Sequence, residues 1–403
     1  MKKISLPTYI DLAIVGAGPQ ALTLVTHLLQ KRAKFRNRFL VFDPSGTWLS
    51  RWRHQFAAQK IPHLRSPAVH HPDPNPYALR AFAENRPHEL FPPYDLPGTQ
   101  LFEDFCGEVI RRWQLENCIY PEKVVEILPH KHRFQLILAA GESIIARRVI
   151  LATGKGIPQF PEWVNRIPSP YPSERLCHSS QIDLRSLHLA GEKILIIGGG
   201  LTSGHLAMGA IAQNANVFLM ARRTWQEKLF DADPGWLGPK YLKGFAAESN
   251  WYRRWELIQQ ARNGGSMTPA MMLQLRRLSR EGKITLKERC EIVGAIWQDS
   301  HWLVKCANGD VYECDRIWLA TGTKFDCQQN PLLEDMLAAY PTEIVNGLPV
   351  LDEYLRLPGS EFFLMGALAA LQVGPVARNL SGGRMASDRI VRTLTKASIA
   401  LSS

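Results

Sequence analysis

The feature that most constrains this chain is a glycine-rich turn that occurs twice, once from Gly16 and again from Gly198. Each turn follows an apolar run, at 12–15 and at 193–197, of the kind found in buried parallel strands. A strand, a glycine-rich turn and a helix form a pyrophosphate site, because the helix N-terminus offers free backbone N–H groups and a favourable dipole. Two such units predict an α/β fold with two Rossmann-like dinucleotide-binding domains.

The first turn has the residues of a complete adenine dinucleotide site. Gly16 permits the tight turn, and Gly18 lets the backbone approach the phosphates. Pro19 and Gln20 then open a helix with an apolar stripe at helical period. The next apolar strand ends at Asp43, where an acidic residue binds the ribose hydroxyls. An ordinary strand, turn and helix is the weaker alternative.

The second turn, with Gly198 and Gly200, differs in the residue that follows its second strand. Arg222 and Arg223 stand where the first unit has an acid. Arginine binds a phosphate through paired hydrogen bonds, so two guanidinium groups suit a ribose 2′-phosphate. This position therefore favours NADPH over NADH, with a solvated basic strand end as the alternative.

Both units continue to an apolar strand that closes in Ala-Thr-Gly, at 152–154 and at 320–322. This arrangement resembles the two-dinucleotide flavoproteins, which carry FAD on the first domain and a nicotinamide nucleotide on the second. In that family the triplets mark the crossings between domains, which implies cofactor contacts for Gly154, Thr321 and Gly322. The family's last helix points its N-terminus at the flavin, and the residues here that match in kind are Gly374, Pro375, Asn379 and Leu380.

The stretch after Asp43 resembles the flavin monooxygenases, and among them the amino acid N-hydroxylases. The turn Gly46-Thr47-Trp48 is typical of that group and implies a cofactor contact for Trp48. The N-hydroxylases typically have a glutamine near the flavin where Lys60 stands, and a lysine for the substrate carboxylate where Arg65 stands.

The resemblance makes three polar residues candidates near both cofactors: Lys60, Thr202 and Ser203. Lys60 and Ser203 are the catalytic candidates among them. A surface lysine and a small helix residue are the respective alternatives.

Two departures from the N-hydroxylase pattern indicate a changed substrate pocket. The Asn-Glu pair that those enzymes carry after the second turn is missing from 230–238, and Thr323 replaces a tyrosine after Ala-Thr-Gly. Trp236 and its aromatic neighbours could line an apolar substrate cavity, or they could be domain core. We therefore expect ornithine and lysine to be poor substrates.

The resemblance implies a FAD- and NADPH-dependent monooxygenase. NADPH would reduce FAD, O2 would add to the reduced flavin, and a C4a-(hydro)peroxide would deliver one oxygen to a small organic substrate. One alternative is a reductase that passes electrons from NADPH to a quinone or a protein carrier. Another is a flavin-binding regulatory protein without turnover.

Composition favours a cytoplasmic enzyme. The chain has 403 residues, 45% of them hydrophobic, and no apolar run approaches the roughly 20 residues that span a bilayer. Lys2 and Lys3 precede an apolar stretch that Pro7 and Asp11 interrupt, so we expect no signal peptide. The net charge of +11 is dispersed and lacks the pattern of a nucleic-acid module. Recruitment of anionic NADPH accounts for that charge, with contact to an anionic membrane as an alternative.

The cysteines exclude a disulfide reductase of this architecture. Such an enzyme needs two close cysteines facing the flavin, whereas the seven cysteines here are scattered. Cys306 and Cys314 flank a predicted hairpin at 308–310 and read as ordinary strand residues. We expect no metal site, and interpret His70 and His71 as part of an exposed loop.

The order of elements predicts that the second domain is inserted into the first. Residues 1–160 form the first part of the FAD-binding domain, 173–324 the NADPH-binding domain, and 325–403 a return segment of the FAD-binding domain. The proline-rich stretch 158–172 reads as a linker. The sequence specifies no oligomeric state.

Overall fold

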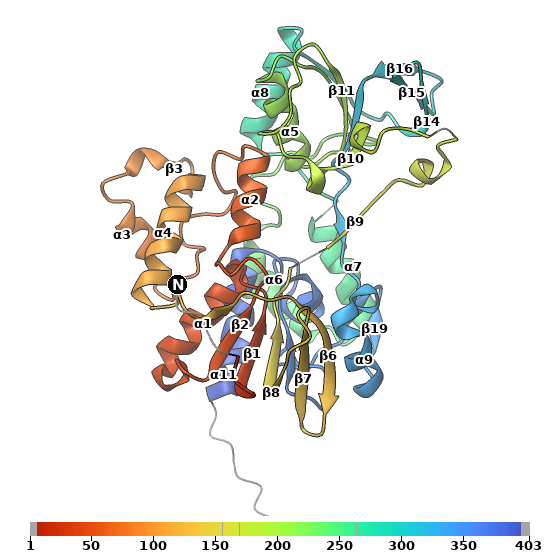
Figure 1. The fold of residues 1–403 in the computed structure, drawn as a ribbon. Coiled ribbons are helices and arrows are strands. Elements are labelled where there is room, and N and C mark those ends of the chain that lie inside the picture. Colours follow the sequence, from red (N-terminus) through yellow and green to blue (C-terminus); the bar gives the residue numbers. More distant parts are fainter. Residues whose placement is uncertain (1–5, 155, 169, 263, 396–403) are drawn as a thin grey trace, which may run out of the picture.

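The computed structural model describes residues 6–154, 156–168, 170–262 and 264–395, so Lys2 and Lys3 lie outside the described residues. The first and last thirds of the chain form the lower part of the molecule, and much of the middle third forms the upper part (Figure 1). Within the described residues, no helix is both long and apolar enough to cross a membrane.

The lower part is built on a mainly parallel sheet with the order β5-β2-β1-β8-β7-β6, in which β21 pairs with the other end of β8. These strands are β1 (Tyr9–Val15), β2 (Phe39–Phe42), β5 (Ile119–Tyr120), β6 (Val124–His130), β7 (Arg133–Leu138), β8 (Ser143–Leu151) and β21 (Phe362–Leu364). Helices α1 (Pro19–Lys31) and α11 (Leu380–Thr395) pack side by side. Because β21 pairs in parallel with β8, residues 362–364 add a strand to the first sheet.

The upper part contains a second parallel sheet with the order β10-β17-β11-β12-β13. Its strands are β10 (Leu176–His178), β11 (Lys193–Ile197), β12 (Asn216–Met220), β13 (Ile284–Lys287) and β17 (Arg316–Leu319). Helices α5 (Leu201–Ile211) and α8 (Pro269–Arg280) accompany it, and an antiparallel sheet follows, made of β14 (Ile292–Gln298), β15 (His301–Cys306) and β16 (Val311–Cys314). Two parallel nucleotide-type sheets confirm the predicted α/β class.

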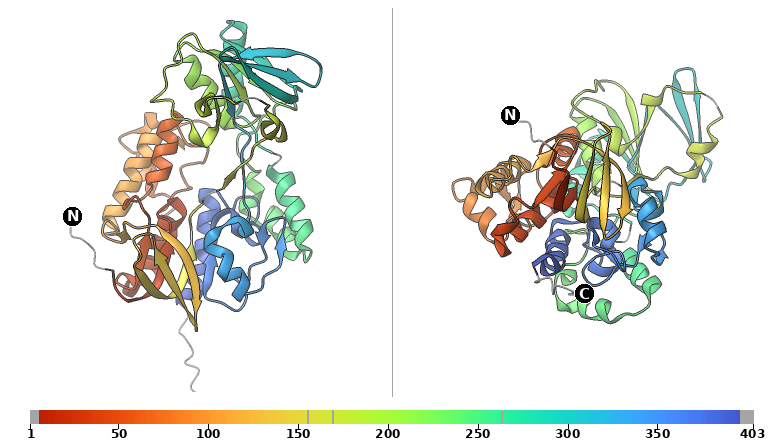
Figure 2. Two further views of the ribbon diagram at one scale, coloured as in Figure 1. Left: turned by 45° about the vertical axis from the view of Figure 1, so that its right-hand side comes forward. Right: turned by 60° about the horizontal axis from the view of Figure 1, so that its bottom comes forward.

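Two antiparallel strands connect the parts: β9 (Ile157–Pro158) pairs with β18 (Thr323–Lys324). The left view of Figure 2 shows these strands running between the upper part and the lower one. The stretch 158–172, expected as a linker, includes packed residues. Its Trp163 is 4% exposed and packs in one hydrophobic cluster with Trp302 on β15, so this stretch is part of the upper part's core.

One segment of the predicted second domain packs on the first. Helices α6 (Pro239–Ala247) and α7 (Trp251–Arg262) contribute Phe245 and Ile258 to the same hydrophobic core as the lower sheet. The guanidinium of Arg254 donates to the backbone oxygen of Leu371 at 3.1 Å, which fixes α7 against the return segment. Residues 239–262 thus lie within the predicted boundaries 173–324 in sequence but pack against the first domain in the structure.

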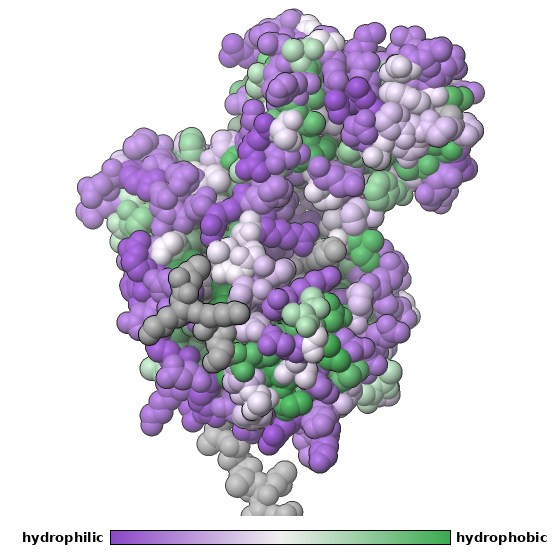
Figure 3. Space-filling view, viewed as in Figure 1, coloured by the Kyte–Doolittle hydropathy of each residue, from purple (hydrophilic) through white to green (hydrophobic). Residues whose placement is uncertain are grey.

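The stretch after Asp43 forms a helical insertion beside α1. It consists of α2 (Ser50–Ala58), α3 (Ala78–Phe82), β3 (Leu90–Phe91), β4 (Leu96–Pro97) and α4 (Thr99–Arg112). The return segment adds α9 (Glu334–Ala339), β19 (Ile344–Val345), β20 (Leu348–Pro349) and α10 (Ala370–Val373). Hydrophilic side chains cover most of the face seen in Figure 3, and hydrophobic ones occur in small groups between them.

Candidate cofactor and active site

A cavity of about 920 Å³ lies where the first glycine turn, the crossing between the domains, the N-terminus of α11 and a loop at 230–234 meet. It is lined by residues 16–20, 152–154 and 379–381, among others. Both halves of the first Rossmann unit and the return segment thus contribute to one space. A ligand of nucleotide size fits a cavity of this volume.

The first turn is shaped for a dinucleotide. Gly16 has φ +104°, and a Cβ there would lie 2.8 Å from the backbone oxygen of Ala152, so only glycine fits. A Cβ on Gly18 would meet nothing within 4 Å, because this residue faces the open cavity. The Asp43 carboxylate accepts from the backbone N–H of Ala17 at 3.1 Å and from the Ser45 hydroxyl at 2.6 Å. These residues fit the phosphates and ribose of FAD.

The residues before α11 are held by the first helix. The Gln20 amide nitrogen donates to the backbone oxygens of Ala377 at 2.9 Å and Asn379 at 3.4 Å. Pro19 and Gln20 line the cavity, and so do Asn379 and Leu380.

Gly374 and Pro375 precede Asn379 by four or five residues. They do not line the cavity, and they set the path of the backbone that leads to α11. Gly374 has φ +92°, and the Pro375 oxygen accepts from Arg262 at 2.8 Å.

The two tryptophans expected at the site, Trp48 and Trp236, are both buried in the hydrophobic core. Trp48 is 3% exposed and donates from its indole nitrogen to the Leu115 oxygen at 2.9 Å, so it packs in the core while the next residue, Leu49, lines the cavity. Trp236 is also core, with its ring 5.7 Å from that of Phe245. Its neighbour Leu237 is the one that lines the cavity.

At the crossing between the domains, Gly154 lies at the cavity, whereas Thr321 and Gly322 form hydrogen bonds to neighbouring segments. Gly154 has φ +60° and lines the cavity. The Thr321 hydroxyl donates to the Gln159 oxygen at 2.5 Å, and the Gly322 oxygen accepts from the His178 ring at 2.9 Å. Thr321 and Gly322 therefore fix the crossing itself.

The second turn is closely packed. A Cβ on Gly198 would lie 2.5 Å from the Ala320 oxygen, and one on Gly200 would lie 3.9 Å from the Gly265 backbone. Ser203 is fully buried, and its hydroxyl lies 2.7 Å from the Gly200 oxygen and 3.0 Å from the Gly198 oxygen. The hydroxyl is thus used within the turn, which contradicts the catalytic interpretation of Ser203.

The basic residues of the second turn occupy different surroundings. Arg222 is exposed beyond β12, whereas the Arg223 guanidinium lies against Gly264. Thr202 is half-buried in the first turn of α5. Arg222 is therefore the more accessible cation for a ribose phosphate.

Lys60 is exposed, has φ +50° and does not line the cavity. It lies two residues past the end of α2. The residue before it, Gln59, is 3% exposed and donates to the Ser179 oxygen of the upper part at 3.1 Å. Of these two adjacent polar residues, Gln59 is the one buried where the two parts meet, and Lys60 is exposed.

Arg65 lines the cavity, but all five of its N–H donors are used by the protein. Its Nε donates to the Leu229 oxygen at 2.9 Å, and Nη1 donates to Asp231 at 2.7 Å and to the Ser266 oxygen at 3.2 Å. Its Nη2 donates to the Lys228 oxygen at 2.5 Å and to the Ser266 hydroxyl at 2.9 Å. No donor is left for a substrate carboxylate, so the predicted role of Arg65 is wrong.

The Arg65 contacts form an electrostatic cluster with Asp231. The second carboxylate oxygen of Asp231 lies 3.3 Å from Arg262. Burial opposes ionisation of Asp231, yet Arg65 and Arg262 hold the pKa of Asp231 below its ordinary value. Burial lowers the pKa of Arg65 in turn.

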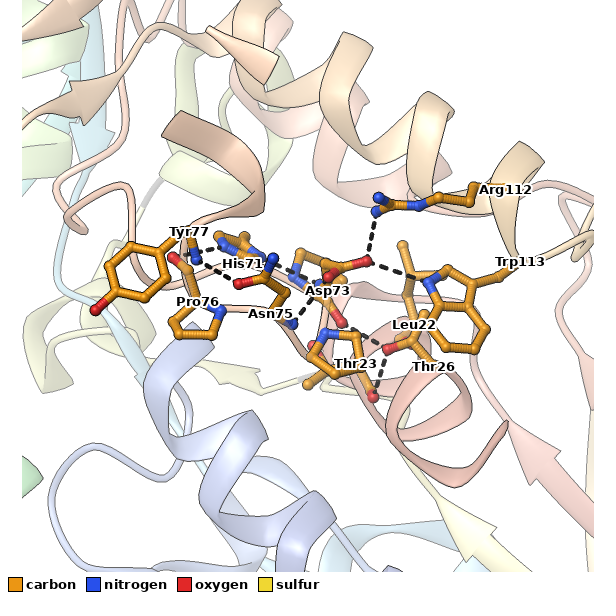
Figure 4. A network of polar contacts seen from close by, with 12 residues as sticks. Leu22, Thr23, Thr26, His71, Asp73, Asn75, Pro76, Tyr77, Arg112 and Trp113 are labelled. Atoms are coloured by element: carbon orange, nitrogen blue, oxygen red, sulfur yellow. Dashed lines mark hydrogen bonds and ion pairs between the residues drawn. The ribbon is translucent and has the colours of Figure 1, made fainter. Parts of the chain in front are cut away.

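The segment 73–77 forms a network of hydrogen bonds and ion pairs, called here the brace (Figure 4). The Asp73 carboxylate is 4% exposed and accepts from Arg112 at 2.5 Å and from the Trp113 indole at 3.1 Å. Arg384 of α11 donates to the Pro74 oxygen at 2.9 Å. The brace thus ties the segment 73–77 to the C-terminal end of α4 and to α11.

His70 and His71 are more enclosed than expected for an exposed loop. His71 is fully buried and His70 lines the cavity. Burial lowers the pKa of each to about 4, so both rings are neutral at neutral pH. The prolines around these histidines suggested an exposed loop. The segment is buried instead, because the Asp73 carboxylate binds Arg112 and Trp113.

The two nucleotide-type sheets and the cavity at the first glycine turn agree with the comparisons to known proteins. Residues 13–156 match the family model described as FAD-NAD(P)-binding, and residues 96–294 match the model for L-lysine 6-monooxygenase/L-ornithine 5-monooxygenase. Over these residues the chain is similar to proteins that bind FAD and NAD(P) and to the lysine and ornithine monooxygenases.

Individual relatives are similar at different levels. L-lysine N6-monooxygenase of Escherichia coli is 26% identical over 176 residues, which is 41% of this chain and 40% of that protein. FAD-dependent urate hydroxylase of Xanthomonas campestris is 39% identical over 98 residues, 23% of this chain and 19% of that protein. The matched segments thus span well under half the length of these curated relatives.

Solved structures share the fold over nearly the whole chain. Reduced ornithine hydroxylase from Pseudomonas aeruginosa has a TM-score of 0.76 at 19% identity, covering 96% of this chain and 98% of that one. The FAD-bound cadaverine monooxygenase of desferrioxamine biosynthesis from Erwinia amylovora has a TM-score of 0.77 at 14% identity, covering 97% and 95%. At these identities the likeness is one of fold.

Proposed function

We propose that this protein is a FAD- and NADPH-dependent monooxygenase of a small organic substrate. The observation that carries the proposal is the single cavity, to which the first turn, the crossing at 152–154 and the loop at 230–234 all contribute. A flavin bound at the first turn would face that loop, which follows the second nucleotide unit in the chain. When bound, FAD supplies hydride acceptance and oxygen activation.

The protein's own contribution is binding, orientation and exclusion of water. Gly18 and the N-terminus of α1 would hold the pyrophosphate, and Asp43 would hold the ribose. Tyr94 and Phe230 approach with ring centroids 5.3 Å apart and both line the cavity. Their rings come from the helical insertion and from the loop at 230–234, so they can limit access of water to the space between.

The substrate of this proposal differs from those in the relatives' names. The segment 230–238 lacks the Asn-Glu pair that the N-hydroxylases carry there, and its Leu237 lines the cavity. Arg65 has no free donor. Ornithine and lysine should therefore stimulate NADPH oxidation little and give no hydroxylamine product.

The proposal includes O2 as co-substrate. It also includes a cytoplasmic location, which the seven free thiols and the composition support.

The test is to reduce the protein with NADPH without oxygen and then mix it with air. A monooxygenase should consume NADPH and O2 faster when its substrate is present. Rapid transfer of electrons to a quinone, with O2 consumed only slowly, would instead indicate a reductase. A flavin that NADPH does not reduce would indicate a protein without turnover.

A further inference from the structure

Two thiols of the upper part lie in contact. Cys306 is on β15 and Cys290 precedes β14 by two residues, and their sulfurs are 2.7 Å apart although the residues are 16 positions apart in the chain. The antiparallel strands bring them together, since Ile292 pairs with Cys306 and the Ala307 N–H donates to the Glu291 oxygen at 2.8 Å. The sulfurs of a disulfide lie about 2.05 Å apart, so a side-chain movement of less than about 1 Å would form one.

The two thiols differ in how easily a small oxidant reaches them. Cys306 is 1% exposed, whereas Cys290 is 9% exposed. Burial and the neighbouring Cys290 thiol raise the pKa of Cys306 to about 12. Because the thiolate is the nucleophile and access decides which sulfur reacts, we expect Cys290 to be oxidised first. Cys306 is then already in position to attack the oxidised sulfur.

The loop that carries Cys290 also holds the residues after β12, among them Arg222. The backbone N–H of Cys290 donates to the Ala221 oxygen at 3.1 Å. The backbone N–H of Trp225 donates to the Glu288 carboxylate at 2.7 Å. Arg222 thus lies between two residues that are both hydrogen-bonded to this loop, so a change in the mobility of the loop reaches the backbone on either side of Arg222.

We propose that Cys290 and Cys306 are a redox-active pair: hydrogen peroxide oxidises them reversibly to a disulfide, and that bond restrains the segment 221–225. The Cys290 sulfur attacks one peroxide oxygen, the O–O bond breaks, and a sulfenic acid and one water form. The Cys306 sulfur then attacks the Cys290 sulfur, the S–O bond breaks, and a second water leaves. The two thiols lose two electrons and two protons, and the peroxide is reduced to two molecules of water.

This modification site goes beyond the proposed function and does not depend on it, because added peroxide supplies the oxidant. Hydrogen peroxide is also what a reduced flavin and O2 form when no substrate takes the oxygen. The pair therefore lies in a protein that, with the proposed function, would generate its own oxidant, and it lies beside the segment that carries the candidate nucleotide cation.

The test treats the full-length protein with a small excess of hydrogen peroxide and then blocks the remaining thiols with iodoacetamide. Peptide mapping by mass spectrometry without reductant should find the Cys290–Cys306 cross-link, and dithiothreitol should remove it. Hydrogen exchange of the amides of 221–225 should be severalfold slower in the oxidised protein, because the cross-link restricts local opening of the loop that holds them. Dithiothreitol should restore the original exchange rates.

Cys306→Ser should form no such cross-link, and peroxide should leave its exchange rates at 221–225 unchanged. Cys177→Ser is the matched control, because it removes a more exposed thiol whose sulfur lies 3.5 Å from the backbone oxygen of Ser173, and it should show both changes.

Oxidation of Cys290 to a sulfinic or sulfonic acid without the cross-link would overturn the proposal. A cross-link that leaves exchange at 221–225 unchanged would overturn it as well. A flavin that NADPH does not reduce would refute the proposed function alone, since neither the cross-link nor the exchange rates require flavin reduction.

Discussion

The two glycine turns have similar sequences but different surroundings. Around the first, Gly18 opens onto a cavity of about 920 Å³ and Asp43 is anchored by hydrogen bonds to Ala17 and Ser45. Around the second, the Gly265 backbone lies against Gly200, and the terminal Arg222 is exposed. A deep, braced site suits a resident cofactor, whereas a shallow site with an exposed cation suits a nucleotide that exchanges at each turnover.

The strongest test of this difference is a bulky side chain at each turn. Gly18→Val should fold and lose nearly all bound FAD, because the side chain enters the cavity without touching protein. Gly200→Val should keep its FAD and lose reduction by NADPH. Flavin content from visible absorbance and folding from circular dichroism separate the outcomes. Full flavin occupancy in Gly18→Val would contradict the assignment of the first turn.

The next largest effect concerns the cluster that joins the cavity wall to the upper part. Arg65→Met should lower the free energy of unfolding by about 3–5 kcal/mol, because the Asp231 carboxylate and the Ser266 hydroxyl would lose the hydrogen bonds that Arg65 donates. Arg80→Met, which breaks an exposed pair, should cost less than about 1 kcal/mol. Urea unfolding monitored by tryptophan fluorescence measures both. A normal stability with altered substrate binding in Arg65→Met would restore the substrate role of Arg65.

Buried histidines should make both parts of the molecule sensitive to acid. Burial lowers the pKa of His71, in the lower part, and of His205, on α5, to about 4 each. Between pH 6.5 and 4 the unfolded chain binds a proton at each site and the folded chain does not, so stability falls as pH falls, by up to about 1.4 kcal/mol per pH unit per site. His71→Gln and His205→Gln should each flatten the pH dependence of unfolding in urea. An unchanged slope in either variant would show that its ring titrates normally.

The smallest expected effect is on nucleotide choice. Arg222→Ala should raise the KM for NADPH about tenfold, consistent with loss of one exposed charge-assisted contact, and leave the KM for NADH nearly unchanged. Arg222 is the better position to test, since Arg223 packs against the loop at Gly264. Steady-state oxidation of both nucleotides provides the measurement. Equal losses with NADPH and NADH would mean that Arg222 is only surface charge.

The elements that sequence predicted well depend on local patterns. Apolar runs at 12–15 and 193–197, each before a glycine turn, gave the two sheets, and the acid after the next strand gave Asp43. The errors concern side chains whose partners are distant in sequence. Arg65 is satisfied by residues more than 160 positions later, which no local pattern reveals.

Other errors arose where adjacent residues have opposite environments. Gln59 is buried at the domain junction while Lys60 is exposed, and Leu237 reaches the cavity while Trp236 packs in the core. The local helix or turn geometry decides which of two adjacent side chains points inward. The residue types alone do not distinguish them.

The central claim is that one FAD, held at the first turn, accepts electrons from NADPH held at the second. The most direct measurement is an anaerobic titration of the purified protein with NADPH, followed by visible absorbance. One equivalent of NADPH per bound FAD should bleach the oxidised flavin completely, and NADH should do so more slowly. A protein purified without flavin, or a flavin that NADPH leaves oxidised, would contradict the account.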